Sequence, residues 1–133
     1  MPDSPEQWRA TSLERGEDAD AMLPERSGSS GPVYMAGYAI ECMLKAYLQQ
    51  AGISFPTSGE AGHNLRGLWK QAGLQLSDLG DKRGHRTFFI QHWSTDMRYW
   101  TDAPQNHTSD QLVQAAKQIA GNLQNRMRRN RSS

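Results

Sequence analysis

The sequence predicts an all-α protein, an up-and-down bundle of about five helices, and three observations support this fold class. Apolar residues recur at three- and four-residue steps along most of the chain, which is the period of a helix with one buried face. Capping residues, such as Ser4 and Thr108, precede two of these stretches. The alternating runs and Asn-Gly type turns that indicate β-hairpins are missing from the sequence.

The first helix is expected from Pro5 to about Leu23. Ser4 and Gln7 form a potential capping box, and proline is favoured at the first helical position. Its periodicity predicts a buried side made of Trp8, Leu13, Ala19, Met22 and Leu23. Residues 27–32, which are rich in serine and glycine, predict a turn after this helix.

The second helix, expected to continue to Ala51 and end at Gly52, is apolar on nearly every side. Only one stripe along it is polar, and that stripe consists of Tyr34, Tyr38, Glu41 and Lys45. A helix of this composition lies at the centre of a bundle or in a subunit interface. A carboxylate on such a helix needs a cation, and we expect Arg98, or another cation from residues 93–99, to bind Glu41.

The remaining segments also read as helices. His63 or Asn64 is expected to cap a short helix that ends at Gly73, with the His63 ring near the free amides of the first turn. Another helix is expected over about residues 86–93. Thr108 and Gln111 form a second capping box, which opens a last helix. The apolar stripe of this last helix contains Leu112, Ala116, Ile119, Leu123 and Met127.

Composition limits the possible functions. The 133 residues suit one domain, with a core over about residues 5–125 and a basic tail at 126–133. The net charge of +1 provides no overall attraction to nucleic acid, so an anionic partner needs a local basic patch. Cys42 is the only cysteine, which excludes a disulfide framework and favours a cytoplasmic protein. We expect no membrane segment, no metal site among the four scattered histidines, and no cofactor.

Three motifs, in this order, resemble the HEPN family, small helical-bundle domains of prokaryotic toxin–antitoxin and defence systems. The first is G-Y-x-x-E-x-x-L-K-A, which begins at Gly37. The second is H-x-L-x-x-L, which begins at His63. The third is a tryptophan followed by Arg-Tyr, here Trp93 with Arg98 and Tyr99. Together they extend over about residues 5–125.

The resemblance implies an up-and-down bundle that forms a homodimer, here through the apolar helix face, and that binds RNA or a nucleotide. Many family members are metal-independent endoribonucleases, and others partner a nucleotidyltransferase. The nucleolytic members carry an arginine and a histidine separated by four to six residues. Arg86 and His92, with five residues between them, match this spacing. Histidine can accept the 2′-hydroxyl proton and arginine can bind the phosphate.

Three readings therefore stay open from the sequence: a binding module, an endoribonuclease using Arg86 and His92, and a non-catalytic adaptor. On one unbroken helix, residues six apart point about 120° away from each other, so the catalytic reading needs a second copy or a helix start near Arg86. The expected binding residues are Tyr38, Glu41, Lys45, Arg98 and Tyr99. The basic tail adds phosphate-contacting candidates, namely Arg126, Arg128, Arg129 and Arg131.

Overall fold

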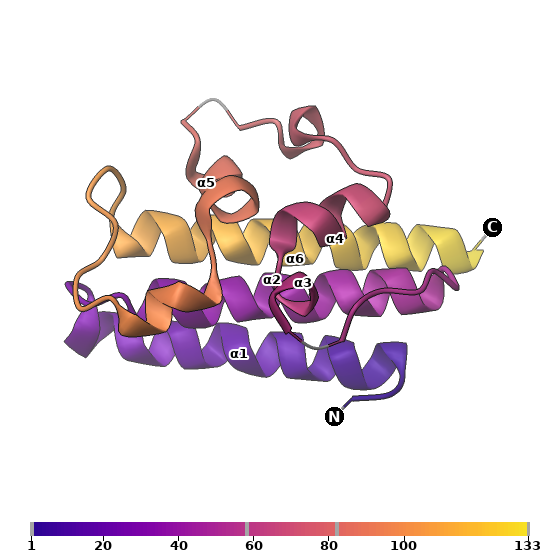
Figure 1. Ribbon diagram of the computed structural model, residues 1–133, viewed down its shortest axis with the longest axis horizontal. Coiled ribbons are helices and arrows are strands. Elements are labelled where there is room, and N and C mark those ends of the chain that lie inside the picture. Colours follow the sequence, from indigo (N-terminus) through magenta and orange to yellow (C-terminus); the bar gives the residue numbers. More distant parts are fainter. Residues whose placement is uncertain (1, 58, 82, 133) are drawn as a thin grey trace.

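The computed structural model describes residues 2–57, 59–81 and 83–132, with side chains described up to residue 130. Within these residues the protein is an all-α bundle, as the sequence predicts, with six α-helices where about five were expected. Three long helices lie side by side: α1 (Pro5–Arg26), α2 (Gly31–Gln50) and α6 (Ser109–Ser132) (Figure 1). No described helix combines the length and the hydropathy that crossing a bilayer requires.

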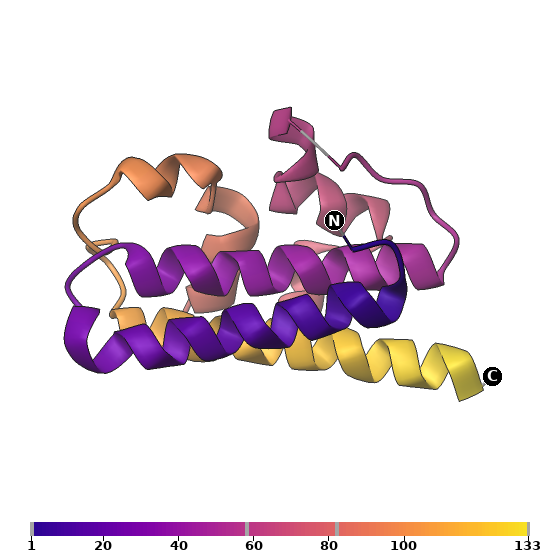
Figure 2. The ribbon, with the colours of Figure 1, turned by 90° about the horizontal axis from the view of Figure 1, so that it is seen from below.

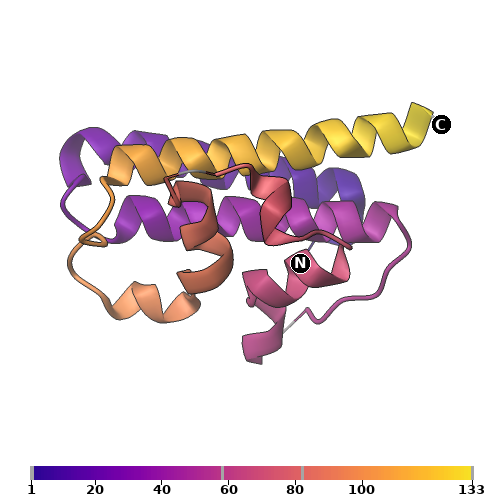
Figure 3. The same cartoon turned by 90° about the horizontal axis from the view of Figure 1, so that it is seen from above.

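Five short elements cover the side of α2 that faces away from α1 and α6 (Figures 2 and 3). Three are α-helices: α3 (Gly59–Gly62), α4 (Leu65–Gln71) and α5 (His85–His92). Two are 3₁₀-helices, η1 (Leu76–Leu79) and η2 (Thr95–Tyr99). The helix expected near residues 86–93 is thus present one residue earlier, whereas α3, η1 and η2 are too short for periodicity to reveal.

Helix α2 lies at the centre of the bundle, as its apolar composition predicts. Residues on all of its sides are buried, from Val33 near its start to Leu48 near its end. Its own chain covers most of α2, and Ala36, Ala39 and Met43 line the floor of an apolar groove between α1 and α6. The homodimer expected through the apolar face of this helix stays a prediction.

The caps of α4 and α6 form as the sequence predicts. The Asn64 side chain accepts a hydrogen bond from the Gly67 amide and caps α4. Thr108 and Gln111 bond each other's amides reciprocally at 3.1 Å. Such side chains satisfy amides that lack a carbonyl partner in the first turn of a helix. Local sequence therefore determines where these two helices begin.

Helix α1 departs from the expectation in three respects. The Ser4 hydroxyl caps the Gln7 amide, but the Gln7 side chain reaches back to the Asp3 amide instead of that of Ser4. The helix continues through Pro24 to Arg26, since a proline in the last turn removes a single intrahelical bond. Leu13, expected in the core, is 49 % exposed, and Ser12 is buried in its place.

The reason for the inverted burial of Leu13 and Ser12 is a specific hydrogen bond. The Ser12 hydroxyl donates to the Ala39 carbonyl of α2 across 2.6 Å. Small side chains and this bond bring the two helices close together, and they turn Leu13 outward toward the space between α1 and α6. A buried hydroxyl needs a hydrogen-bond partner, and the Ala39 carbonyl is that partner for Ser12. Ser12 can therefore be buried between the two helices without leaving a polar group unsatisfied.

Candidate nucleic-acid interface

The most buried acidic group among the described residues is the Glu41 carboxylate on α2. One of its oxygens accepts from Lys45 Nζ at 3.0 Å, and the other lies 2.9 Å from His63 Nδ1. Since an ionised carboxylate is only an acceptor, this His63 nitrogen is the donor. Lys45 is also enclosed, with its ammonium 5.0 Å from the centre of the Trp8 ring. Both oxygens of the buried acid therefore have partners.

The prediction that Arg98, or another cation from residues 93–99, binds Glu41 is wrong. Arg98 does not reach this acid, because η2 is fixed over the first turn of α2. There the Ser30 hydroxyl lies within hydrogen-bonding distance of the Met97 and Trp100 carbonyls, at 3.2 and 2.7 Å. At a rise of about 1.5 Å per residue, Glu41 lies roughly 16 Å further along the helix. The segment before α4 covers that position instead and supplies His63 as the partner.

Three aromatic rings pack together next to this acid, one pair stacked and two pairs edge-to-face. Trp93 is stacked on Tyr34 at 6.1 Å and meets the edge of Tyr38 at 5.4 Å. The Tyr34 and Tyr38 hydroxyls are 3.2 Å apart. Burial raises the pKa of Tyr38, and the bond to Tyr34 raises it further. These rings, which we call the aromatic support, are uncharged at neutral pH and join α2 to the residue before the η2 segment.

Gly37, the first residue of the G-Y motif, has a steric role in this support. A Cβ atom at this position would lie 2.0 Å from Trp93 Nε1, which is closer than real Cβ contacts. The indole therefore rests directly on the backbone of α2, and only glycine leaves room for it. The contact with Trp93 thus explains why glycine, and no larger residue, stands at the start of the G-Y motif.

An exposed platform of aromatic and cationic groups follows the support. Tyr99 is 73 % exposed, and the Arg98 guanidinium carbon lies 4.9 Å from the centre of its ring. Trp100 is 47 % exposed. The platform, defined as Arg98, Tyr99 and Trp100, is anchored by the buried Met97 and by the Ser30 hydroxyl. Exposed rings that are held in place and accompanied by arginine are suited to stacking on nucleobases.

The five expected binding residues therefore separate into two groups. Arg98 and Tyr99 are accessible to a ligand, and Tyr38 is partly accessible behind them. Glu41 and Lys45 are closed off from solvent and act on the site only by holding α2 and His63 in position. The sequence did not reveal His63 as the partner of Glu41, although its place at the start of the H-x-L-x-x-L motif was a signal.

Arg86 and His92 are not brought together within this chain. The Arg86 guanidinium donates to the Gln118 side chain at 2.7 and 3.0 Å and to the Leu79 carbonyl at 2.7 Å. His92 is exposed at the last position of α5, with its ring centre 6.1 Å from that of Phe88. The arginine thus fastens α5 and η1 to α6.

The other two histidines contact each other. His85 Nδ1 and His107 Nδ1 are 2.8 Å apart and join the start of α5 to the loop before α6. One nitrogen of this pair must carry a proton and the other must not. Burial lowers the pKa of His107, and the neighbouring His85 lowers it further. Within the described residues no three metal-ligating side chains lie close enough to hold an ion.

The region expected to be a basic tail is the end of α6. Met127 is buried in the core, so the helix stays attached to the bundle through this region. Arg126 is half-buried, and Arg128 and Arg129 are exposed. The side chain of Arg131 lies outside the described residues.

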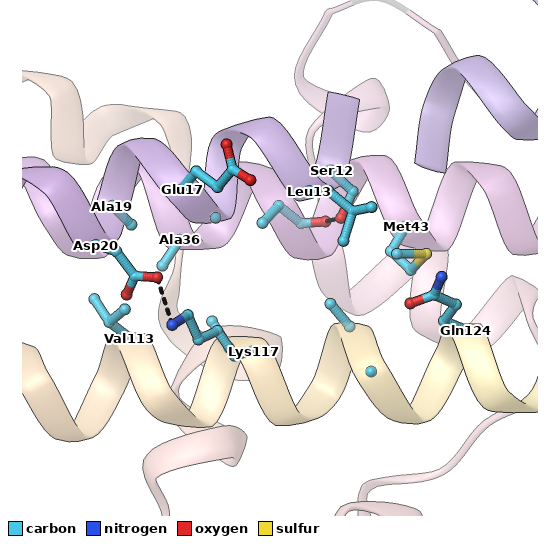
Figure 4. A pocket seen from close by; sticks show the side chains of 15 residues that line it. Ser12, Leu13, Glu17, Ala19, Asp20, Ala36, Met43, Val113, Lys117 and Gln124 are labelled. Carbon is cyan, nitrogen blue, oxygen red and sulfur yellow. Dashed lines mark hydrogen bonds and ion pairs between the residues drawn. The ribbon is translucent and has the colours of Figure 1, made fainter. Parts of the chain in front are cut away.

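An apolar groove of about 300 Å³ lies between α1 and α6 (Figure 4). Its floor is α2, and small residues at Gly16, Ala39 and Gly121 make it hollow. An ion pair between Lys117 and Asp20 crosses it toward one end (Figure 4). Leu13, the large side chain that turned outward, lines the same groove.

No protein-family model, no curated protein and no solved structure matches this chain.

Proposed function

We propose that the protein is a HEPN-like module that binds RNA or a nucleotide in the cytoplasm, within a bacterial toxin–antitoxin or defence system. The observation that carries this proposal is the exposed Tyr99 ring with the Arg98 guanidinium against it. The buried Met97 and the bonds of the Ser30 hydroxyl hold the backbone of η2 against α2, so the segment that carries the exposed rings is in place before a base stacks on them. The three motifs that resemble the HEPN family also favour the proposal.

The experiment that tests the proposal measures binding of a labelled single-stranded oligoribonucleotide by fluorescence anisotropy. One stacked base contributes about 1–3 kcal/mol, so Tyr99→Ala is expected to weaken binding by roughly 5- to 150-fold. Tyr99→Phe keeps the ring and is expected to bind like the wild type. Ile53→Ala removes an exposed apolar side chain from a different loop and serves as the control. Unchanged binding by Tyr99→Ala contradicts the proposed platform.

The catalytic alternative predicts a different result. If Arg86 and His92 cleave RNA, cleavage persists in EDTA and is lost in His92→Ala. Because Arg86 is bound to Gln118 and Leu79, catalysis at this pair also requires those bonds to be exchanged for a phosphate. No cleavage in EDTA by the wild-type protein, together with RNA binding, favours the binding module.

The proposal includes a homodimer, and we place the second copy on the apolar groove. Leu13 is half exposed at its rim, and open space at Gly16 and Gly121 allows a partner helix to approach closely. The two rims have opposite charges, with Glu17 on α1 and Lys117 on α6. A two-fold related copy presents the same pair in reverse, so each lysine can exchange its ion pair with Asp20 for one with an acid of the partner.

A further inference from the structure

A second, smaller hollow lies on another side of the molecule, where α6 passes η1 and α4. Its volume is about 170 Å³. Its apolar wall includes the buried side chains of Trp69 and Leu123. Leu79 and Ile119 complete this wall, and the polar part of the lining comes mainly from the second half of α6, including Arg126 and Arg129 of the expected basic tail. We call it the α6 hollow.

Four polar side chains of α6 converge on this hollow because of their spacing. They occupy positions three and four residues apart, which lie on one face of a helix. These residues are Asn122, Asn125, Arg126 and Arg129. Within the described residues, neither of these two arginine side chains has a hydrogen bond, an ion pair or a ring contact. The hollow therefore has two free guanidinium groups and two amide groups at its rim.

One carboxylate opposes them. Asp78 of η1 lines the hollow, and its Oδ2 accepts from the Gln75 amide at 2.7 Å. The two guanidinium groups outnumber this acid, so the rim attracts anions overall. The Trp69 indole N–H donates to the Gln75 carbonyl and is not available to a ligand. The donors available to an anion are thus the arginine and asparagine side chains.

We propose that the α6 hollow binds a phosphate monoester, the terminal phosphate of a nucleotide or of an RNA end. A monoester carries a charge of about −1.5 to −2 at neutral pH, which matches two guanidinium groups. Its three terminal oxygens can accept bidentate bonds from arginine and further bonds from amides. An internal phosphodiester has one charge and is flanked by sugars on both sides, so it suits an open groove better than a hollow of this size.

The phosphate site gives the ligand of the proposed nucleotide-binding function a chemical class. It rests on that proposed function only for the choice of a nucleotide as the ligand. It does not involve the platform at Tyr99. Tyr99→Ala is therefore expected to weaken RNA binding while leaving the binding of 5′-AMP to the hollow unchanged. If Tyr99→Ala binds RNA like the wild type, the binding of 5′-AMP still tests the hollow. If 5′-AMP does not bind, the RNA experiment still tests the platform.

The test compares 5′-AMP with adenosine by isothermal titration calorimetry. We expect 5′-AMP to bind and adenosine not to bind, and inorganic phosphate to compete with 5′-AMP. The double variant Arg126→Gln/Arg129→Gln is expected to lose at least roughly tenfold in affinity, since each charge-assisted bond contributes about that much or more. Arg128→Gln removes one positive charge from α6 outside the hollow, half the charge change of the double variant, and is expected to bind 5′-AMP like the wild type.

Asp78→Asn provides a test in the opposite direction. Removing the opposing charge is expected to tighten binding of 5′-AMP several-fold, because like charges near a shared site repel each other. The asparagine oxygen can still accept from the Gln75 amide, so the 3₁₀-turn is expected to stay intact. Weaker or equal binding in Asp78→Asn would contradict an anion site at this hollow.

A second arm distinguishes the two sources of the phosphate. A 5′-phosphorylated oligoribonucleotide is compared with its 5′-hydroxyl form and with 5′-AMP. Tight binding of 5′-AMP identifies a free nucleotide, whereas a preference confined to the phosphorylated RNA identifies an RNA end, and both results support the hollow. The proposal is overturned if the phosphate makes no difference in either pair. It is also overturned if Arg128→Gln weakens binding as much as the double variant does.

Discussion

The contact between Gly37 and Trp93 provides the sharpest test of how α2 holds the platform. In Gly37→Ala the new Cβ would lie 2.0 Å from the indole Nε1, whereas real Cβ contacts stay beyond 3.0 Å. The indole or the helix backbone therefore has to shift by about 1 Å, and overpacking of this kind costs about 1–3 kcal/mol. Alanine also favours a helix over glycine by about 1 kcal/mol, which acts in the other direction.

Gly121→Ala is the matched control, because it is the same exchange inside α6 with no atom of the same chain within 4 Å of the new Cβ. Since Gly121 also lines the groove proposed for the second copy, both variants are compared in the Leu13→Glu background, in which the dimer is expected to be lost. We expect Gly121→Ala to raise the free energy of unfolding, and Gly37→Ala to lie about 1–3 kcal/mol below it. The corresponding melting temperatures should differ by about 4–12 °C for a domain of this size. Urea unfolding followed by circular dichroism measures the difference.

A double-mutant cycle assigns the loss to the indole. In a Trp93→Ala background the clash has no partner, so Gly37→Ala is expected to behave like Gly121→Ala. If Gly37→Ala stabilises the protein that retains Trp93 as much as Gly121→Ala does, Trp93 does not rest on α2. The steric account of the G-Y motif would then be refuted.

Three further changes test other parts of the structure. Glu41→Gln leaves the buried Lys45 ammonium without its carboxylate and is expected to lower the free energy of unfolding by about 3–5 kcal/mol, measured in urea; full stability with loss of nucleotide binding would instead place Glu41 at the ligand. The pKa of His107 is lower in the folded protein than its ordinary value of 6.5. Its contribution to the free energy of unfolding is therefore complete above pH 6.5 and is lost as the pH falls from 6.5 through the folded-state pKa. His107→Asn should reduce this decline between about pH 7.5 and 5.5, and an unchanged pH profile contradicts the role of the His85 contact. Leu13→Glu is expected to convert the dimer to a monomer in analytical ultracentrifugation, and a wild-type protein that is monomeric at every concentration contradicts the proposed groove contact.

Local patterns in the sequence predicted most of the fold. The period of apolar residues predicted the three long helices, and α2 is enclosed as its composition indicates. The Asn64 and Thr108 caps formed because each involves a side chain and an amide three residues away. Such interactions depend on neighbouring residues only, so the sequence by itself determines them.

The partners of the side chains were decided by tertiary structure. The pattern on α2 indicated that Glu41 would be buried and need a cation, but not that residues before α4 would cover it with His63 while η2 docked three turns away. Likewise, periodicity favoured Leu13 for the core, yet the bond from Ser12 to α2 determined the rotation of α1. Helical period defines the faces of a helix, whereas the segment that covers each face depends on how the connecting loops and packed side chains fit together in three dimensions.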